Sequence, residues 1–105
     1  MKPFIDIAGA SGTLYRFQRI DGPERLPSTA GNFVFLRSDP QGDTIVCCGT
    51  ARSLVLAAPA WKSAVEQHQA SDIFVRLNVS RTVRTAEHED IVERQTPILA
   101  ILDPG

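Results

Sequence analysis

Glu87 is the residue of this chain whose type and position best suit chemistry. In a helix it would share one stripe with Val83, four residues before it, and Ile91, four residues after it. A carboxylate between apolar neighbours needs a partner, because burying an unpaired charge is costly. Two interpretations stay open: a divalent-metal or phosphate site, or an ordinary salt bridge, which occurs more often in such places.

Two histidines accompany predicted helices. His68 shares a helical face with Trp61 and Val65, so it could act as a general base or contact a phosphate at the edge of a cleft. The more common role of such a residue is a hydrogen-bonded structural histidine. His88 has Arg84 and Val92 as helix neighbours, and we interpret it as a surface residue.

Arginines cluster late in the sequence. Arg76 and Asn78 alternate on what we take as the non-core face of a strand, with Arg81 and Arg84 close behind. They could form a small basic patch for phosphate groups. A dedicated nucleic-acid binder usually has a basic excess, whereas this chain has 11 basic and 12 acidic residues and a net charge of −1. The charge balance therefore favours a solvated face with acidic residues nearby.

Cys47 and Cys48 are adjacent, and a disulfide between neighbours is sterically difficult. In a strand they would point to opposite faces and fill the core. The first twelve residues lack the apolar region of a signal peptide. Two free thiols then predict a reducing compartment, the cytoplasm. The two histidines lie too far from the cysteines in sequence for a zinc site.

The longest apolar stretch, Leu54 to Trp61, has eight residues and contains Pro59. A bilayer span needs roughly 20 apolar residues, so no membrane segment is predicted. The length of 105 residues with 43% apolar composition is typical of one folded domain. We therefore expect a soluble chain with one domain over residues 1–105.

Periodicity and turn residues predict the order of the elements. We expect strands first, in two hairpins, then a helix, a strand, a second helix capped by Ser80, and a short apolar tail. The predicted strands are 4–8, 13–20, 32–37, 44–48 and 73–79, and the predicted helices begin at Pro59 and at Arg81, the second ending near Arg94. The apolar tail, 98–102, is either a last strand or a segment that packs on a partner. Hairpins with segregated helices indicate the α+β class, with a small, mainly antiparallel sheet flanked by helices.

Several short motifs follow one another between residues 31 and 97. Gly31-Asn32-Phe33 opens one predicted strand, and Cys47-Cys48-Gly49 ends the next, before a turn through Leu54. Glu87 and then Pro97 follow in the late helix and just beyond it. In this order residues 31–99 resemble a GIY-YIG domain, with residues 4–20 as an added N-terminal hairpin. Glu89 nearly matches the same spacing, but it points to the opposite side of the helix.

The resemblance implies a phosphodiester-cleaving site in which two tyrosines, an arginine and a metal-binding glutamate act together. Here Phe33 stands at the first tyrosine without its hydroxyl, and Cys47 stands at the second. Arg52 comes too early for the arginine, and Lys62 is a substitute only if residues 55–59 are an insertion. Glu87 is the one matching residue, and it would hold Mg²⁺ or Mn²⁺ if the site were active.

Because each lost transition-state contact costs about 10²–10³ in rate, we do not expect efficient cleavage, and no cofactor is predicted for the inactive domain. The first hypothesis is a non-catalytic domain with a binding or assembly role. Apolar residues near both ends of the chain would complete the core or pair two copies as a homodimer. A divergent metal-dependent nuclease using Glu87, with Lys62 or Arg52 on the phosphate, is the second hypothesis. A nucleic-acid-binding module using Arg52, Arg76, Arg81 and Arg84 is the third.

Overall fold

A computed structural model describes residues 2–103 of the chain. The strands are β1 (Phe4–Ala8), β2 (Leu14–Ile20), β3 (Gly31–Asp39), β4 (Gly42–Ala51), β5 (Asp72–Leu77) and β6 (Leu99–Ile101). The helices are α1 (Ala58–His68) and α2 (Arg81–Gln95), with short 3₁₀ turns η1 (Pro23–Arg25) and η2 (Leu54–Ala57).

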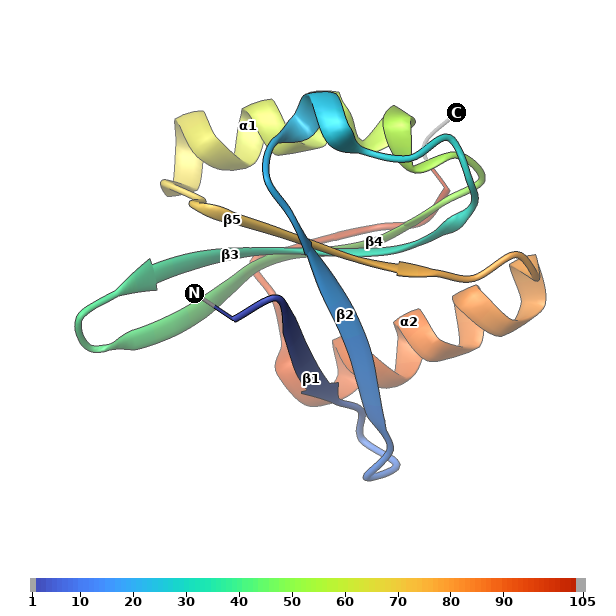
Figure 1. The fold of residues 1–105 in the computed structure, drawn as a ribbon. Helices are drawn as coiled ribbons and strands as arrows, with labels where there is room; N and C mark the ends of the chain where they lie inside the picture. Colours follow the sequence, from blue (N-terminus) through green and yellow to red (C-terminus); the bar gives the residue numbers. More distant parts are fainter. Residues whose placement is uncertain (1, 104–105) are drawn as a thin grey trace.

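All six strands belong to one sheet, in the order β1-β2-β5-β3-β4-β6. Every neighbouring pair is antiparallel except β4 and β6, which are parallel. The sheet curls, with α1 across one face and α2 against the other (Figure 1). The expected α+β class, with a mainly antiparallel sheet flanked by helices and an N-terminal hairpin, is confirmed.

Local sequence signals set several element ends. Ser80 caps α2, accepting a hydrogen bond from the Val83 amide at 3.3 Å, as expected of an N-cap. Pro59 stands in the first turn of α1, where its missing N–H costs nothing. The predicted strand 73–79 was too long, because β5 ends at Leu77 and Asn78 already turns its side chain toward other polar groups.

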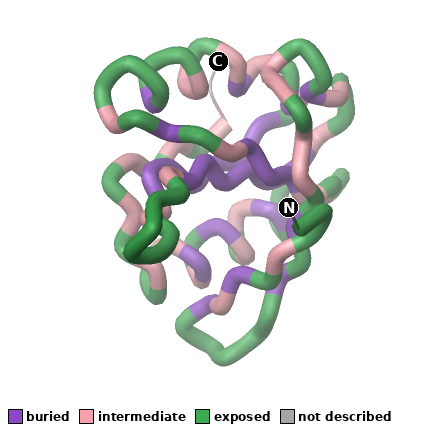
Figure 2. The backbone as a smooth tube through the Cα atoms, turned by 60° about the vertical axis from the view of Figure 1, so that its left-hand side comes forward, coloured by how far each residue is buried: buried purple, intermediate pink, exposed green. Residues whose placement is uncertain are grey.

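Each face of the sheet has its own apolar core. On the α1 face the buried residues include Phe33, Phe35, Val75, Leu54 and Ala64. On the α2 face they include Phe17, Val34, Phe74, Cys48 and Ile91. Figure 2 shows the buried segments in the middle of the molecule and exposed chain at the hairpin tips. Arg76 lies on the same face of β5 as Phe74. This face is covered by α2, whereas the sequence predicted that it is exposed to solvent.

A bulge in β4 affects which side chains of this strand, including the two cysteines, face each side of the sheet. The register shifts between Phe35 and Leu36, which pair with Cys47 and Ile45, so Val46 is an extra residue. Val46 and Cys47 then both face α1, while Cys48 faces α2. Both thiols are buried, and burial raises the pKa of each to about 12. The expectation that they fill the core on opposite faces is confirmed.

Candidate functional site

Glu87 lies on the side of α2 that faces the sheet, and its carboxylate is held by two residues of the β5 segment. Arg76 Nε donates to Oε1 at 2.8 Å and Arg76 Nη2 approaches Oε2 at 3.4 Å. Asn78 Nδ2 donates to Oε1 at 3.0 Å. The Glu87 side chain is 16% exposed and that of Arg76 is 32% exposed. The pair is thus a partly buried, forked salt bridge with a third donor.

The same hydrogen bonds continue into the sheet. Asn78 Nδ2 also donates to Asn32 Oδ1 at 3.1 Å, and Asn32 Nδ2 donates to the Arg84 carbonyl at 2.9 Å. Asn32 is buried and stands opposite Arg76 in the β3–β5 register. A chain of polar contacts therefore joins β3, the end of β5 and α2, and we call these residues the Glu87 network: Asn32, Arg76, Asn78 and Glu87.

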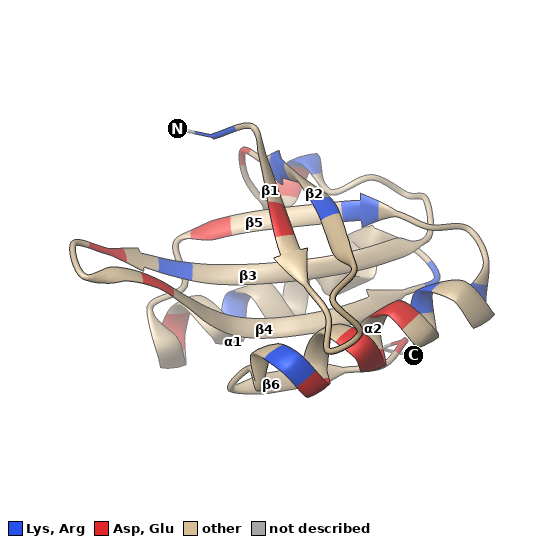
Figure 3. Ribbon diagram, turned by 90° about the horizontal axis from the view of Figure 1, so that it is seen from below, with Lys and Arg blue, Asp and Glu red and all other residues tan. Residues whose placement is uncertain are grey.

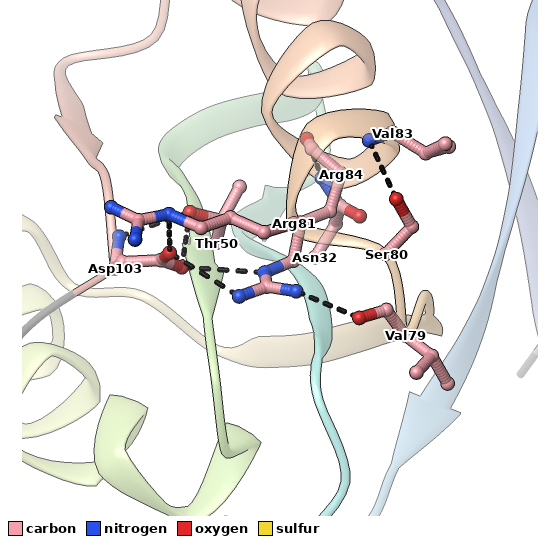
Figure 4. Close-up of polar contacts among 8 residues, drawn as sticks. All are labelled: Asn32, Thr50, Val79, Ser80, Arg81, Val83, Arg84 and Asp103. Atoms are coloured by element: carbon pink, nitrogen blue, oxygen red, sulfur yellow. Dashed lines mark hydrogen bonds and ion pairs between the residues drawn. The ribbon is translucent and has the colours of Figure 1, made fainter.

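A second polar cluster joins α2 to the chain beyond β6. The buried Arg84 guanidinium donates to the Val79 carbonyl at 3.0 Å and to Asp103 Oδ2 at 3.3 Å. Thr50 Oγ1 donates to Asp103 Oδ1 at 2.9 Å, and Arg81 Nε lies 3.3 Å from Oδ2 (Figure 4). Arg81, Arg84, Asp103 and Thr50 form what we call the Asp103 cluster.

The Asp103 cluster governs the titration of its carboxyl. Burial alone would raise the pKa of Asp103, but hydrogen bonds from Arg84 and Thr50 and the charges of Arg84 and Arg81 outweigh it. The pKa of Asp103 is therefore below its usual value. The carboxylate thereby fastens the end of β6 to β4 and α2.

A third polar contact docks the N-terminal hairpin on α2. Asp90 accepts from the Ser11 amide at 2.9 Å, from Ser11 Oγ at 2.7 Å and from Tyr15 Oη at 2.7 Å. The hydrogen bonds from Ser11 and then Tyr15 lower the pKa of Asp90, and the bond to Asp90 raises the pKa of Tyr15. A side chain at Gly9 would overlap the Asp90 carboxylate, which explains the small residue there.

His88 was wrongly interpreted as a surface residue. It is 5% exposed, and burial lowers its pKa, opposed by the charges of Glu89 and Asp103. The buried stripe of α2 is Arg84, His88 and Ile91, whereas Val83 is 46% exposed. Helical spacing predicts a stripe of Val83, Glu87 and Ile91. The observed contact face differs because two polar residues, Arg84 and His88, lie on the side of α2 that the sheet covers.

The two residues that the resemblance sets at the tyrosine positions lie in the core on the α1 face of the sheet. Phe33 is fully buried on the α1 face and stacks on Phe35, with ring centroids 4.9 Å apart. Cys47 is fully buried in the same core. Gly49 pairs with Phe33, and a side chain at Gly49 would overlap the Phe33 ring. Glu87, in contrast, bonds to groups on the α2 face.

The remaining predicted catalytic residues are also separated from Glu87. Lys62 is exposed on α1, and His68 is partly buried at the end of that helix. The His68 carbonyl accepts a hydrogen bond from Arg37 at 3.1 Å. The structure brings Phe33 and Cys47 together in one core, but it does not bring either of them, or Lys62 and His68, into the Glu87 network.

The predicted nucleic-acid-binding arginines do not form one uncompensated patch. Arg76 bonds to Glu87, and Arg81 and Arg84 bond to Asp103. Arg52 is exposed in the turn after β4. Figure 3 shows basic and acidic segments interspersed over the sheet and α2.

The Glu87 network suits a guanidinium better than a divalent ion. Its donors occupy both carboxylate oxygens, and a metal ion there would lie beside the Arg76 charge. Across residues 2–103, no three His, Cys, Asp or Glu side chains gather as metal ligands. The arrangement accordingly fits a structural role for Glu87 as it stands.

Comparisons of the chain with protein-family models, curated proteins and solved structures give no match. In the described part of the chain, neither helix has the length and apolar character needed to cross a membrane.

Proposed function

We propose that the chain is a GIY-YIG-like domain that has a binding or assembly role and does not cleave phosphodiesters efficiently. The order of β3, β4, α1, β5 and α2 agrees with the element order on which the resemblance rests. A binding or assembly role is compatible with this element order, because a fold by itself does not determine function.

The separation of the candidate groups carries this proposal. Phe33 and Cys47 are fully buried on the α1 face, whereas Glu87 bonds to Arg76 and Asn78 on the α2 face. Cleavage needs its reacting groups held together within about 3–3.5 Å of the reacting atoms. The Phe33 ring has no hydroxyl, and burial keeps the Cys47 thiol protonated, with its pKa raised to about 12.

Metal-dependent cleavage of labelled DNA and RNA, single- and double-stranded, tests the proposal. The wild type is compared with Glu87→Gln and with Glu89→Gln, a matched change at an exposed position of the same helix. With Mg²⁺ or Mn²⁺ we expect no cleavage above a no-protein control in any of the three. Cleavage by the wild type and Glu89→Gln that disappears in Glu87→Gln would overturn the proposal.

One observation favours the alternative of a divergent metal-dependent nuclease. The Arg76 guanidinium carbon lies 5.5 Å from the centre of the Tyr15 ring and also bonds to Glu87, so an arginine, a tyrosine and a glutamate are neighbours. Arg76 would then replace Lys62 or Arg52 on the phosphate. Loss of cleavage in both Glu87→Gln and Arg76→Gln, with Lys62→Ala unaffected, would support this alternative.

A nucleic-acid-binding module without cleavage is the third proposal, and it receives the least support. Arg76, Arg81 and Arg84 already have carboxylate partners, so contact with phosphates would compete with those pairs. Such binding would weaken steeply with salt as counterions are released. Binding of labelled RNA or DNA between low and physiological salt measures it.

A further inference from the structure

Strand β1 forms one edge of the sheet and pairs only with β2. The Arg19 amide donates to the Pro3 carbonyl at 2.8 Å, and the Gly9 amide donates to the Thr13 carbonyl at 2.9 Å. In an antiparallel pair, hydrogen-bonded positions alternate along the strand. The odd-numbered residues of β1 therefore bond to β2, and the even-numbered residues turn their backbone groups outward.

Side chains cover the two ends of this outward row. Gln95 Nε2 donates to the Ala8 carbonyl at 2.8 Å, and Arg19 Nε donates to the Lys2 carbonyl at 2.9 Å. Between them, the outward N–H and C=O groups of Phe4 and Asp6 have no hydrogen-bond partner among the described residues. Two donors and two acceptors thus lie in a row on an open edge.

The surface beside this row is concave and has a mixed lining of apolar and charged side chains. A cavity of about 540 Å³ lies along the edge, and its lining combines apolar side chains (Phe4, Ile5, Ile7, Leu36 and Ile45) with polar and charged ones (Lys2, Asp6, Arg16, Asp43 and Gln95). Phe4 is 46% exposed, and the carbon of the Arg16 guanidinium lies 5.6 Å from the centre of its ring. An added strand would therefore find backbone partners together with apolar and charged side-chain contacts.

We propose that the occupant of this edge is β1 of a second copy of the chain. A two-fold axis through Ile5 makes the pairing antiparallel and sets Phe4 opposite the partner's Asp6, and Asp6 opposite the partner's Phe4. Those positions are the ones with outward, unbonded backbone groups, so four hydrogen bonds form and the sheet continues between the copies. The bonds already made by Ala8 and Lys2 are left intact.

Charge complementarity also favours this register. Lys2 and Asp6 share one face of β1, and the pairing brings Lys2 diagonally beside the partner's Asp6, within reach of a long side chain. Asp6 is 42% exposed beside Arg16, so it can take a second cation. A register centred on Asp6 would instead set two like carboxylates opposite each other and require the Ala8 carbonyl. The inference rests on the proposed assembly role and names its partner.

Charge exchange tests the pairing by sedimentation equilibrium. The wild type is expected to be dimeric, and Asp6→Lys or Lys2→Asp alone to weaken dimerisation roughly tenfold or more, because like charges then meet across both ends of the pairing. An equimolar mixture of the two variants restores complementary charges and should recover the dimer, which also shows that both variants fold. Glu66→Lys, a charge reversal at an exposed position of α1, should still sediment as a dimer, like the wild type.

Hydrogen exchange of the wild type tests the backbone contacts directly. The Phe4 and Asp6 amides should be protected in concentrated samples and exchange quickly after dilution, while Ile5 and Ile7 stay protected at both concentrations. A monomeric wild type, dimers unaffected by both variants, or capture of an unrelated extended peptide by a monomer at β1 would overturn the inference. This result is independent of cleavage, so a monomer without cleavage would leave the non-catalytic proposal standing.

Discussion

On the α1 face of the sheet, Phe33, Phe35 and Trp61 pack ring against ring, with aliphatic side chains around them. On the α2 face, a smaller apolar core is flanked by the Glu87 network, the Asp103 cluster and the contact of Asp90 with the hairpin turn. The α1 face gains its stability from burial, which is not directional. The α2 face needs particular donors and acceptors in particular places, because each buried polar group must be paired.

The largest effect is expected on the α1 face. Phe35 is fully buried, and its ring centre lies 5.1 Å from that of Trp61. Phe35→Ala should lower the free energy of unfolding by about 3–5 kcal/mol, through lost burial and the cavity left behind. Denaturant unfolding measures it, and a loss below about 1 kcal/mol would show that this core is not closely packed.

On the α2 face, the Asp103 cluster should give the next largest effect. Arg84→Met keeps most of the side-chain volume but leaves a partly buried carboxylate with fewer donors, and should cost about 2–3 kcal/mol. Arg81→Met is the matched control, because the Arg81 side chain is 79% exposed and exposed pairs contribute about 0–1 kcal/mol. Equal losses in the two variants would contradict the burial of the Arg84 pair.

A smaller effect is expected from the Glu87 network. Glu87→Gln removes the charge from a partly exposed pair and should cost about 1–2 kcal/mol, with Glu89→Gln close to neutral. A double-mutant cycle with Arg76→Gln should give a coupling energy of about 0.5–2 kcal/mol between the two sites. Additive losses would mean that Arg76 and Glu87 do not stabilise each other.

The smallest effects follow pH. Burial lowers the pKa of His88 below its ordinary 6.5, so as pH falls through 6.5 the unfolded state takes up the proton first and stability declines. The lowered pKa values of Asp90 and Asp103 act in the same sense below pH 3.8, where the unfolded state again binds more protons. Unfolding measured from pH 7.5 to 5 should show a decline that His88→Gln removes. An unchanged pH slope in that variant would contradict the burial of neutral His88.

The contrast between the faces also explains what the sequence could predict. Apolar runs beside turn residues located β3 and β4, a period-2 pattern located β5, and Ser80 and Pro59 marked helix starts, because these signals are local. The α2 contact surface was misjudged at His88 and Arg84, since polar residues paired across the fold look like solvent-exposed residues in a sequence. Nothing local signals that Asp103 reaches Thr50 or that Asp90 reaches Ser11. The sheet order and the β4 bulge likewise depend on tertiary pairing.

The candidate site shows the same division. The sequence singled out Glu87 and weighed a salt bridge for it, but it could not identify Arg76 as the partner or place Phe33 on the opposite face. Strand alternation tells which residues share a face, yet it does not tell which helix covers that face. Phe33 and Cys47 are separated from Glu87 because they lie in the core on the α1 face, whereas Glu87 belongs to α2, which covers the other face.

The structural role of Glu87 is tested most directly by adding Mn²⁺ to the wild type and measuring the paramagnetic broadening of its NMR signals. If Glu87 is a structural partner of Arg76, we expect its carboxyl signal and the Arg76 Nε–H signal to broaden no more than those of Glu89 and other exposed positions. Selective broadening at Glu87 and Arg76 at low Mn²⁺, lost in Glu87→Gln, would contradict the account and make Glu87 a metal ligand.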